Sequence, residues 1–415
     1  MQTALAGFIR DTAEGLEADA ILRRCVHCGF CTATCPTYQL TGDELDGPRG
    51  RIYLIKRVLE GEAPTTKTQQ HLDRCLTCLS CETTCPSGVR YGRLLDIGRK
   101  VVAERVGRTS KEQAIRWTLR RGLLARNLFA GALTMGRAMK PLLPHALGSK
   151  VPAADPAGEW PAPRHARRMI ALTGCVQPAL APVIDAAMAR ILDRIGISLL
   201  RVADGGCCGA LPLHLDEADE AMVLARRNID AWWPQFQQGV EAVVVTATGC
   251  GVMAKDYGHL LRHDAAYAEK AQFIAERVRD PVEVVGAEWP NIAPMIAMDV
   301  GAQKVAFHAP CTLQHGLKLK GRVEEILLAI GLELTPVADG HLCCGSAGTY
   351  SILQPELSAR LKANKLAALE KGRPELIASA NIGCIVHLAG GTDTPVRHWI
   401  ELLDARMRSR GRSAG

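Results

Sequence analysis

Aromatic residues and long apolar runs are both scarce in this sequence. Phe, Trp and Tyr make up only 4% of the 415 residues. Proteins that bind single-stranded nucleic acids stack the bases on aromatic rings, so we expect no nucleic-acid partner. No segment approaches the roughly twenty apolar residues that cross a membrane as a helix. Any contact with a membrane is therefore expected to be peripheral.

The motifs of several enzyme classes and of secretion are also missing. The chain shows no glycine fingerprint of a dinucleotide-binding fold, no P-loop and no nucleophile elbow. In the opening MQTALAGFIRDTAEGL, Arg10 and Asp11 interrupt the apolar core that a secretory signal needs. We therefore expect a cytoplasmic protein with reduced thiols, and no catalytic residue in this chain.

Cysteine, by contrast, is abundant. The chain has 16 cysteines, and eight of them form two copies of one pattern, CVHCGFCTATCP and CLTCLSCETTCP. Cysteines separated by two, two and three residues and followed by proline form the run that holds a pair of 4Fe-4S clusters in bacterial ferredoxins. In such pairs the last cysteine of each copy ligates the other cluster. The pattern predicts two ligand sets, a first of Cys25, Cys28, Cys31 and Cys85 and a second of Cys75, Cys78, Cys81 and Cys35.

Zinc and disulfides are the competing interpretations of these eight cysteines. Structural zinc usually takes separated CxxC pairs, whereas here three evenly spaced cysteines and a Cys-Pro occur twice. Disulfides are typical of oxidising compartments and small secreted domains. Both alternatives explain the pattern less well than two 4Fe-4S clusters.

A helix is predicted between the two cysteine runs. Ile52, Ile55 and Leu59 recur at helical spacing after Pro48 and before Gly61. A helical insert of this length resembles the α-helical ferredoxin domain of respiratory dehydrogenases, and we assign residues 1–98 to such a domain.

The next segment is strongly basic. Residues 99–150 hold twelve Lys or Arg and only two Glu, whereas the whole chain has a net charge of +7. Leu, Phe, Met and Trp117 alternate with these basic residues, as in helices that lie on anionic membranes. The alternative is a helix packed between domains or against a partner subunit, with its arginines solvated. Together with a linker rich in Pro and Ala, this segment covers residues 99–165.

The remainder of the chain contains an internal repeat. In both copies a Cys-Cys-Gly follows the first cysteine by 32 residues, and a fourth cysteine comes later. The predicted repeats span 166–295 and 296–405, and 406–415 form a basic tail. The first repeat contains Cys175, Cys207, Cys208 and Cys250, and the second contains Cys311, Cys343, Cys344 and Cys384.

Each repeat has the pattern of a small α/β unit. The short apolar runs MIALT, ISLLRV, AVVVTA, KVAFH, LELTPV and CIVHLA are predicted strands, and amphipathic helices separate them. Open α/β sheets place their sites outside the carboxyl ends of the strands. We therefore expect a multidomain protein, with an N-terminal α-helical ferredoxin domain and two pseudo-symmetric α/β repeats whose cysteines lie at strand ends.

These repeat cysteines are candidate metal ligands. Four thiolates form a competent soft site for a further iron-sulfur cluster or for zinc, although they are also explained as small buried apolar residues. His308, three residues before Cys311, and His387, three after Cys384, are further candidates in corresponding predicted strands. A histidine held by a backbone carbonyl is the alternative for both.

The repeat resembles the cysteine-rich CCG domain of heterodisulfide reductase. With the ferredoxin-type domain before it and GCIVHLAGGTDTPVRHWIELLD near its end, the chain resembles the family of glycolate oxidase (glycolate dehydrogenase) iron-sulfur subunits. The full CCG motif closes each copy with CxxC, whereas Met253 and His387 replace the last cysteine here. The ligand set for the non-cubane cluster of heterodisulfide reductase is thus incomplete.

The resemblance implies an electron-transfer subunit. It would receive electrons from FAD-containing subunits that oxidise glycolate and pass them to a membrane acceptor, a quinone, at the inner face of the cytoplasmic membrane. FAD and the substrate would bind only to the partner subunits. The alternatives are a thiol-disulfide reductase of the heterodisulfide type and the iron-sulfur subunit of a lactate or glycerol-3-phosphate dehydrogenase.

Overall fold

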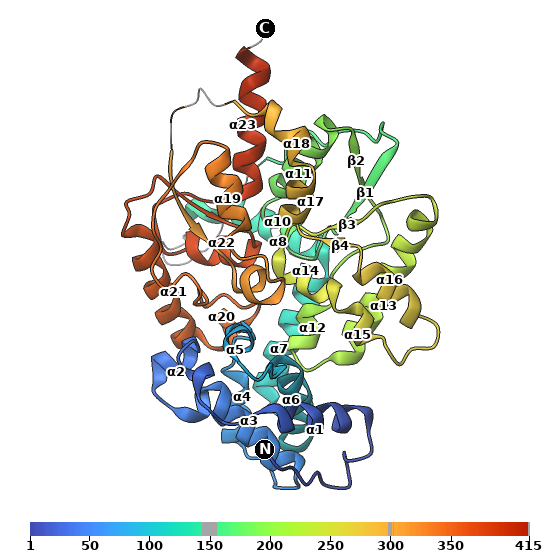
Figure 1. Cartoon of the computed structure of the whole chain (residues 1–415), viewed down its shortest axis with the longest axis vertical. Helices are drawn as coiled ribbons and strands as arrows, with labels where there is room; N and C mark the ends of the chain where they lie inside the picture. The colour runs from blue at the N-terminus through green and yellow to red at the C-terminus, as the bar shows by residue number, and fades with distance from the viewer. Residues whose placement is uncertain (143–155, 298–300, 302, 414–415) are drawn as a thin grey trace.

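A helical domain lies at one end of the molecule, and two α/β units stand side by side above it (Figure 1). The structure is a computed structural model that describes residues 1–142, 156–297, 301 and 303–413. Part of the predicted linker, 143–155, and the last two residues of the predicted basic tail, 414–415, lie outside the described residues.

The amino-terminal domain is built from short helices around one apolar core. Its elements are α1 Ala13–Arg24, η1 Phe30–Thr32, α2 Pro36–Thr41, η2 Glu44–Asp46, α3 Pro48–Leu59, α4 Thr66–Asp73, α5 Ser80–Thr84 and α6 Tyr91–Val106. The helix predicted between the two cysteine runs is α3, and the prediction is confirmed. Helices α3 and α6 cross closely at Gly98, where a Cβ atom would lie 2.5 Å from Cγ1 of Ile55. This crossing buries Ile55, Leu94 and Leu95 completely, and it fixes the helices that flank both cysteine runs.

The basic segment forms two helices, α7 Ser110–Leu124 and α8 Arg126–Met139, followed by η3 Lys140–Leu142. Arg108 and Arg116 both reach Asp73 of the helical domain and Asp216 of the first repeat, with N···O distances between 2.6 and 3.4 Å. Arg120 pairs with Glu220 at 3.2 Å. The packing alternative supposed that these arginines would be solvated. In the structure they are instead paired with carboxylates. They join three parts of the chain through shared carboxylates.

The two α/β units contain four-stranded sheets of the same topology. The orders are β2-β1-β3-β4 and β6-β5-β7-β8, and every strand pair is parallel. The strands are β1 Arg167–Ala171, β2 Ile197–Arg201, β3 Val243–Val244, β4 Val278–Arg279, β5 Lys304–His308, β6 Glu333–Leu334, β7 Leu376–Ser379 and β8 Val396–His398. The shared order confirms the pseudo-symmetry that the cysteine spacing predicts.

Helices cover these sheets. In the first unit they are α10 Gln177–Leu180, α11 Val183–Arg194, α12 Ala210–His214, α13 Ala218–Gln237, α14 Thr248–Lys255, α15 Tyr257–Leu260, α16 Ala268–Ala275, α17 Pro281–Ala287 and α18 Trp289–Ile292, with η4 Ala293–Met295 after them. In the second unit they are η5 Thr312–Gly316, α19 Arg322–Ala329, α20 Tyr350–Leu353, α21 Pro355–Glu370, α22 Ile382–Ala389 and α23 Trp399–Ser413.

One predicted strand is wrong. The run CIVHLA lies in helix α22. The strand expected in this part of the chain is β7, which ends just before that helix. Ile382, Ile385 and Leu388 are buried at intervals of three, which is the spacing of a helix face. A short apolar run does not by itself distinguish a buried strand from a buried helix. His387 and Cys384 consequently lie on a helix and not in or at the end of a strand, and Cys250 similarly lies in the first turn of α14.

A shared core holds the two units together. Residues of both sheets and of α11, α17, α19 and α23 form one apolar cluster. Arg190 of α11 pairs with the buried Asp404 of α23 at 2.7 Å, and Nε2 of His398 lies 3.0 Å from the carbonyl oxygen of Thr246. The cysteines of the two repeats are therefore held at fixed positions relative to each other.

Replacing Asp216 by Asn should weaken the contact of the basic helices with the first repeat. Asn keeps the shape and tolerates the left-handed backbone at this position, φ 67°. Arg108 and Arg116 are then left to share one carboxylate, and we expect a loss of about 2 kcal/mol. The measurement is the thermal midpoint of the anaerobically purified protein.

Glu62→Gln is the matched control. It removes the exposed pair of Glu62 with Arg57, and exposed pairs contribute little to stability. Equal midpoints for Asp216→Asn and Glu62→Gln would contradict the role given to the shared carboxylates.

Candidate functional site

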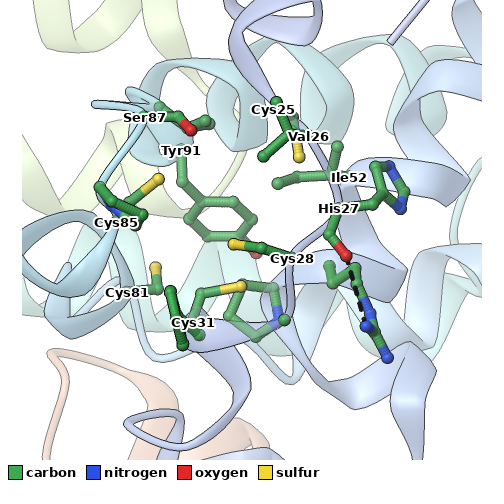
Figure 2. Close-up of a pocket in the computed structure, with 16 residues that line it drawn as sticks. Cys25, Val26, His27, Cys28, Cys31, Ile52, Cys81, Cys85, Ser87 and Tyr91 are labelled. Atoms are coloured by element: carbon green, nitrogen blue, oxygen red, sulfur yellow. Dashed lines mark hydrogen bonds between the residues drawn. The ribbon is translucent and has the colours of Figure 1, made fainter.

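The cysteines of the first predicted set meet at the edge of the helical domain. Cys25 follows α1, Cys28 and Cys31 lie in and around η1, and Cys85 follows α5. They line one pocket together with Cys81 (Figure 2). Other walls of the pocket come from apolar side chains, among them Val26, Ile52 and Tyr91. These four cysteines form the first thiol group, which reaches the surface of the chain because Cys28 is exposed.

Both cysteine runs have the same unusual backbone. The residue two positions after the first cysteine is left-handed in each copy, His27 at φ 56° and Thr77 at φ 51°. The residue four positions after it is left-handed too, Gly29 at φ 86° and Leu79 at φ 60°. For residues other than glycine this conformation costs about 1–2 kcal/mol. Such turns form concave nests that favour anionic groups such as iron-sulfur clusters, so the strain has a function in a cluster loop.

The second predicted set lies deeper. Cys81 and Cys35 are buried, and burial holds the pKa of Cys78 and of Cys81 well above the ordinary value for a thiol. The hydroxyl of Tyr91 donates to Sγ of Cys75 at 3.5 Å. The structure thus brings together the four cysteines of each predicted set, and those of the second set form the second thiol group.

A buried arginine beside the second set was not singled out in the sequence. Arg51 of α3 is only 1% exposed, and its Nε donates to the carbonyl oxygen of His71 at 2.7 Å. Its charge acts on Cys75 and Cys35. A fixed cation at this place would stabilise the negative charge of a cluster bound by these thiolates. The signal in the sequence was a charged residue next to Ile52 on the apolar face of the predicted helix.

The spacing of the eight thiols fits clusters better than single ions. One tetrahedral zinc ion holds its sulfur ligands about 4 Å apart. In the part of the chain that the structure describes, three or more metal-ligand atoms lie within 4.8 Å of one another at two places, and neither includes any of these eight cysteines. A cubane binds its ligands at separate iron corners and therefore needs the wider spacing.

The four cysteines of each repeat form a row of neighbouring thiols. In the second repeat, Sγ of Cys311 lies 4.0 Å from Sγ of Cys343, and Cys344 has Cys343 and Cys384 as neighbours. The hydrogen bond with Cys343 and burial raise the pKa of Cys311 far above that of a free thiol. In the first repeat, Cys207 and Cys208 are likewise buried between Cys175 and Cys250.

The glycine after each Cys-Cys pair is required by its surroundings. Gly209 has φ +93° and Gly345 has φ +90°, a region that residues with a Cβ atom rarely adopt. A Cβ atom on Gly345 would lie 2.7 Å from the carbonyl oxygen of Ser358. The close passage of the loop against α21 therefore sets the position of the paired thiols.

The second cysteine run of the helical domain packs against the second repeat. The charges of Cys78 and Cys311 act on each other, as do those of Cys78 and Cys343. Leu76, Cys343 and Tyr350 belong to one buried apolar cluster, with Cys78 and Cys311 at its edge. The second thiol group is therefore continuous with the thiols of the second repeat.

Of the two candidate histidines, the structure places only one at metal-ligand spacing from the thiols. His308 lies at the end of β5 within 4.8 Å of Cys344 and Cys384. His387 faces the hydroxyl of Ser358, 3.4 Å from its Nε2. The second place with ligand-like spacing, at Asp43, Asp46 and His71, is occupied by ion pairs of Asp46 with His71 and Arg74.

The fold and the thiol groups define a class, two-cluster iron-sulfur proteins with a duplicated cysteine-rich domain. Residues 21–89 match the 4Fe-4S dicluster domain, and residues 170–255 and 305–389 match the Cysteine-rich domain. The chain is 53% identical to the glycolate oxidase iron-sulfur subunit of Escherichia coli, over 97% of this chain and 98% of that protein. The chain belongs to the family of glycolate oxidase iron-sulfur subunits.

More distant relatives share one or both parts. A probable glycolate oxidase iron-sulfur subunit of Bacillus subtilis is 29% identical over 90% of this chain and 89% of that protein. Lactate utilization protein A of Bacillus licheniformis is 26% identical over 54% of this chain and 93% of its own length. The predicted family and fold class are confirmed, and so is the prediction of 4Fe-4S clusters.

Serine substitutions should reveal which cysteines share a cluster. We expect Cys28→Ser and Cys85→Ser to lose the same electron paramagnetic resonance signal, and Cys78→Ser and Cys35→Ser to lose the other. In each variant the iron content of the helical domain should fall from about eight to about four atoms. If Cys85→Ser instead matches Cys78→Ser, the last cysteine of each run belongs to its own copy and the crossed assignment is wrong.

Proposed function

We propose that this chain is the electron-transfer subunit of a flavin-dependent dehydrogenase complex that oxidises glycolate to glyoxylate. The observation that carries the proposal is the similarity over the full length to the Escherichia coli glycolate oxidase iron-sulfur subunit. The two thiol groups of the helical domain, placed one after the other, support it. The flavin of a partner subunit takes two electrons from the 2-hydroxy acid. Clusters bound to this chain carry such electrons singly.

The ligand sets proposed for the two clusters follow from the grouped thiols. Cys25, Cys28, Cys31 and Cys85 hold the first, and Cys75, Cys78, Cys81 and Cys35 hold the second. Arg51 stabilises the negative charge at the second set, where it is buried beside Cys75.

The flavoprotein partner docks over the first thiol group. This group reaches the surface at Cys28, and the side chains around it include Val26, 67% exposed, and Phe30, 62% exposed. Apolar side chains exposed beside a redox site are typical of a docking surface. Electrons then enter at the first group and pass to the second, which is buried toward the second repeat.

A quinone at the inner face of the cytoplasmic membrane is the proposed acceptor. Helix α8 exposes Leu128, Met135 and Met139, with exposed fractions of 66%, 62% and 45%, and Leu142 follows at 83%. Apolar side chains on a basic segment favour contact with an anionic lipid surface. No helix in the described ranges has the length and apolar character to cross a membrane.

The burial of five of the eight repeat cysteines speaks against a thiol-disulfide reductase, and the other three, Cys175, Cys250 and Cys311, are half-buried. Cys343, Cys344 and Cys384 are at most 5% exposed. A disulfide substrate must reach the attacking sulfur, and these thiols are covered by the chain. We therefore place them within the protein's own relay or a metal site.

Glycolate should reduce the clusters of the assembled complex. When the chain is combined with its flavoprotein partners without oxygen, glycolate should bleach both the flavin absorption and the broad cluster absorption. In a Cys28→Ser complex the flavin should still bleach, while the remaining cluster responds only to dithionite. Bleaching of the flavin alone in the unmodified complex would contradict the relay, and faster bleaching by lactate would change the proposed substrate.

Membrane contact should depend on the apolar face of α8. We expect Leu128→Ser with Met135→Ser to lower co-sedimentation with phosphatidylglycerol vesicles about tenfold, because two apolar side chains no longer enter the lipid. Val223→Ser, which removes a 56% exposed side chain from α13, is the control. Equal binding by the double variant and the unmodified chain would contradict the membrane surface.

A further inference from the structure

The two repeats differ in the residues that surround their thiols. Three residues before the first cysteine, the first repeat has Leu172 and the second has His308. The long helix after each Cys-Cys-Gly turn contains a second pair of corresponding residues. Counted from the helix residue that contacts the glycine of the turn, the seventh residue is Asn228 in the first repeat and Lys365 in the second. Both members of each pair are buried. The second site thus has titratable side chains at two places where the first has uncharged ones.

His308 is buried without a hydrogen-bond partner. The side chain is 1% exposed, and neither Nδ1 nor Nε2 finds a donor or acceptor in the described structure. Buried polar atoms are nearly always paired, and an unpaired imidazole calls for a ligand. Leu172 fills the equivalent place in the first repeat with an apolar side chain, so packing alone does not require a histidine here.

Two thiols lie close enough to His308 to bind the same metal ion. One ring nitrogen of His308, Sγ of Cys344 and Sγ of Cys384 lie within 4.8 Å of one another, and all three residues are buried. A zinc ion with bonds of about 2.1 Å to nitrogen and 2.3 Å to sulfur needs ligand atoms about 3.5–4 Å apart, so a small closure of the three side chains suffices. The first repeat has no such group among its described residues.

We propose that the second repeat binds one zinc ion through His308, Cys344 and Cys384. Two thiolates balance the charge of the ion, and the neutral imidazole adds none. The fourth position of the tetrahedron falls to water or another small ligand, as in zinc sites with three protein ligands.

Two neighbouring residues support this site without binding the ion. Lys365, 3% exposed, donates from Nζ to the carbonyl oxygen of Asp339 at 2.9 Å, and its charge interacts with those of Cys343 and Cys344. His387 contacts the backbone of Cys344 and the hydroxyl of Ser358. His387 thus helps to position the backbone of the Cys-Cys pair, and Lys365 places a positive charge beside its thiols.

The test uses zinc ions and the full chain with its iron-sulfur clusters in place. The protein is purified without oxygen, incubated with Zn²⁺ and desalted, and zinc and iron per chain are measured by mass spectrometry. We expect about one retained zinc per chain. His308→Leu, which copies the first repeat, and Cys344→Ser should each lose it, while His308→Cys should keep it.

Cys208→Ser is the matched control, because Cys208 is the counterpart of Cys344 in the first repeat and should leave the zinc in place. Unchanged iron content and an unchanged thermal midpoint show that the variants fold. Zinc kept by His308→Leu, or zinc lost equally by Cys208→Ser, overturns the proposal. So does iron beyond about eight atoms that disappears with Cys344→Ser, because a cluster then occupies the site. The inference does not rest on the electron relay, since the zinc content is independent of reduction by glycolate.

Discussion

Many thiols of this protein are buried, yet they must carry a negative charge when they bind metal. This constraint organises the structure. A charged group in an apolar interior is costly unless it is paired or bound to metal. The thiols of the second group meet this cost with Arg51, Tyr91 and the turns of the cysteine run. The apolar core of the helical domain lies among the helices that flank its cysteine runs. The packing of this core therefore sets the positions of the thiols.

The same constraint explains why the domains are joined so firmly. Electron transfer needs fixed distances, and a hinge between the helical domain and the repeats would vary them. Arg108 and Arg116 hold α7 to both sides through shared carboxylates, and Cys78 lies in a common apolar cluster with Cys311 and Tyr350. Arg108, Arg116 and Arg120 thus serve the interior, while apolar residues of this segment remain exposed at the surface.

The sequence predicted what depends on local pattern. The two cysteine runs, the helix α3 and the strands β1, β2 and β5 follow from spacing and periodicity. The helix α22 was missed because its apolar run is short enough for either structure. The partners of Arg116 and of Arg51 could not be predicted, since both depend on residues brought together by the fold. The grouping of thiols across domains, Cys78 with Cys311, likewise appears only in three dimensions.

Duplication explains both the symmetry of the repeats and their differences. Two copies of one sheet pack through a common core, so the backbone of each helps to hold the other. Once the architecture is fixed in this way, one copy can keep the role of a scaffold while the other changes its buried side chains. The first repeat has Leu172 and Asn228 around its thiols, which suit a structural core. The second has a buried lysine, Lys365, which donates to the carbonyl oxygen of Asp339. It also has an unpaired histidine, His308, which is costly in an apolar core unless it acts on a bound group. It is also the repeat whose thiols meet the second cysteine run. The unpaired histidine therefore favours the second repeat over the first as the copy with a bound group, which is where we propose the zinc site.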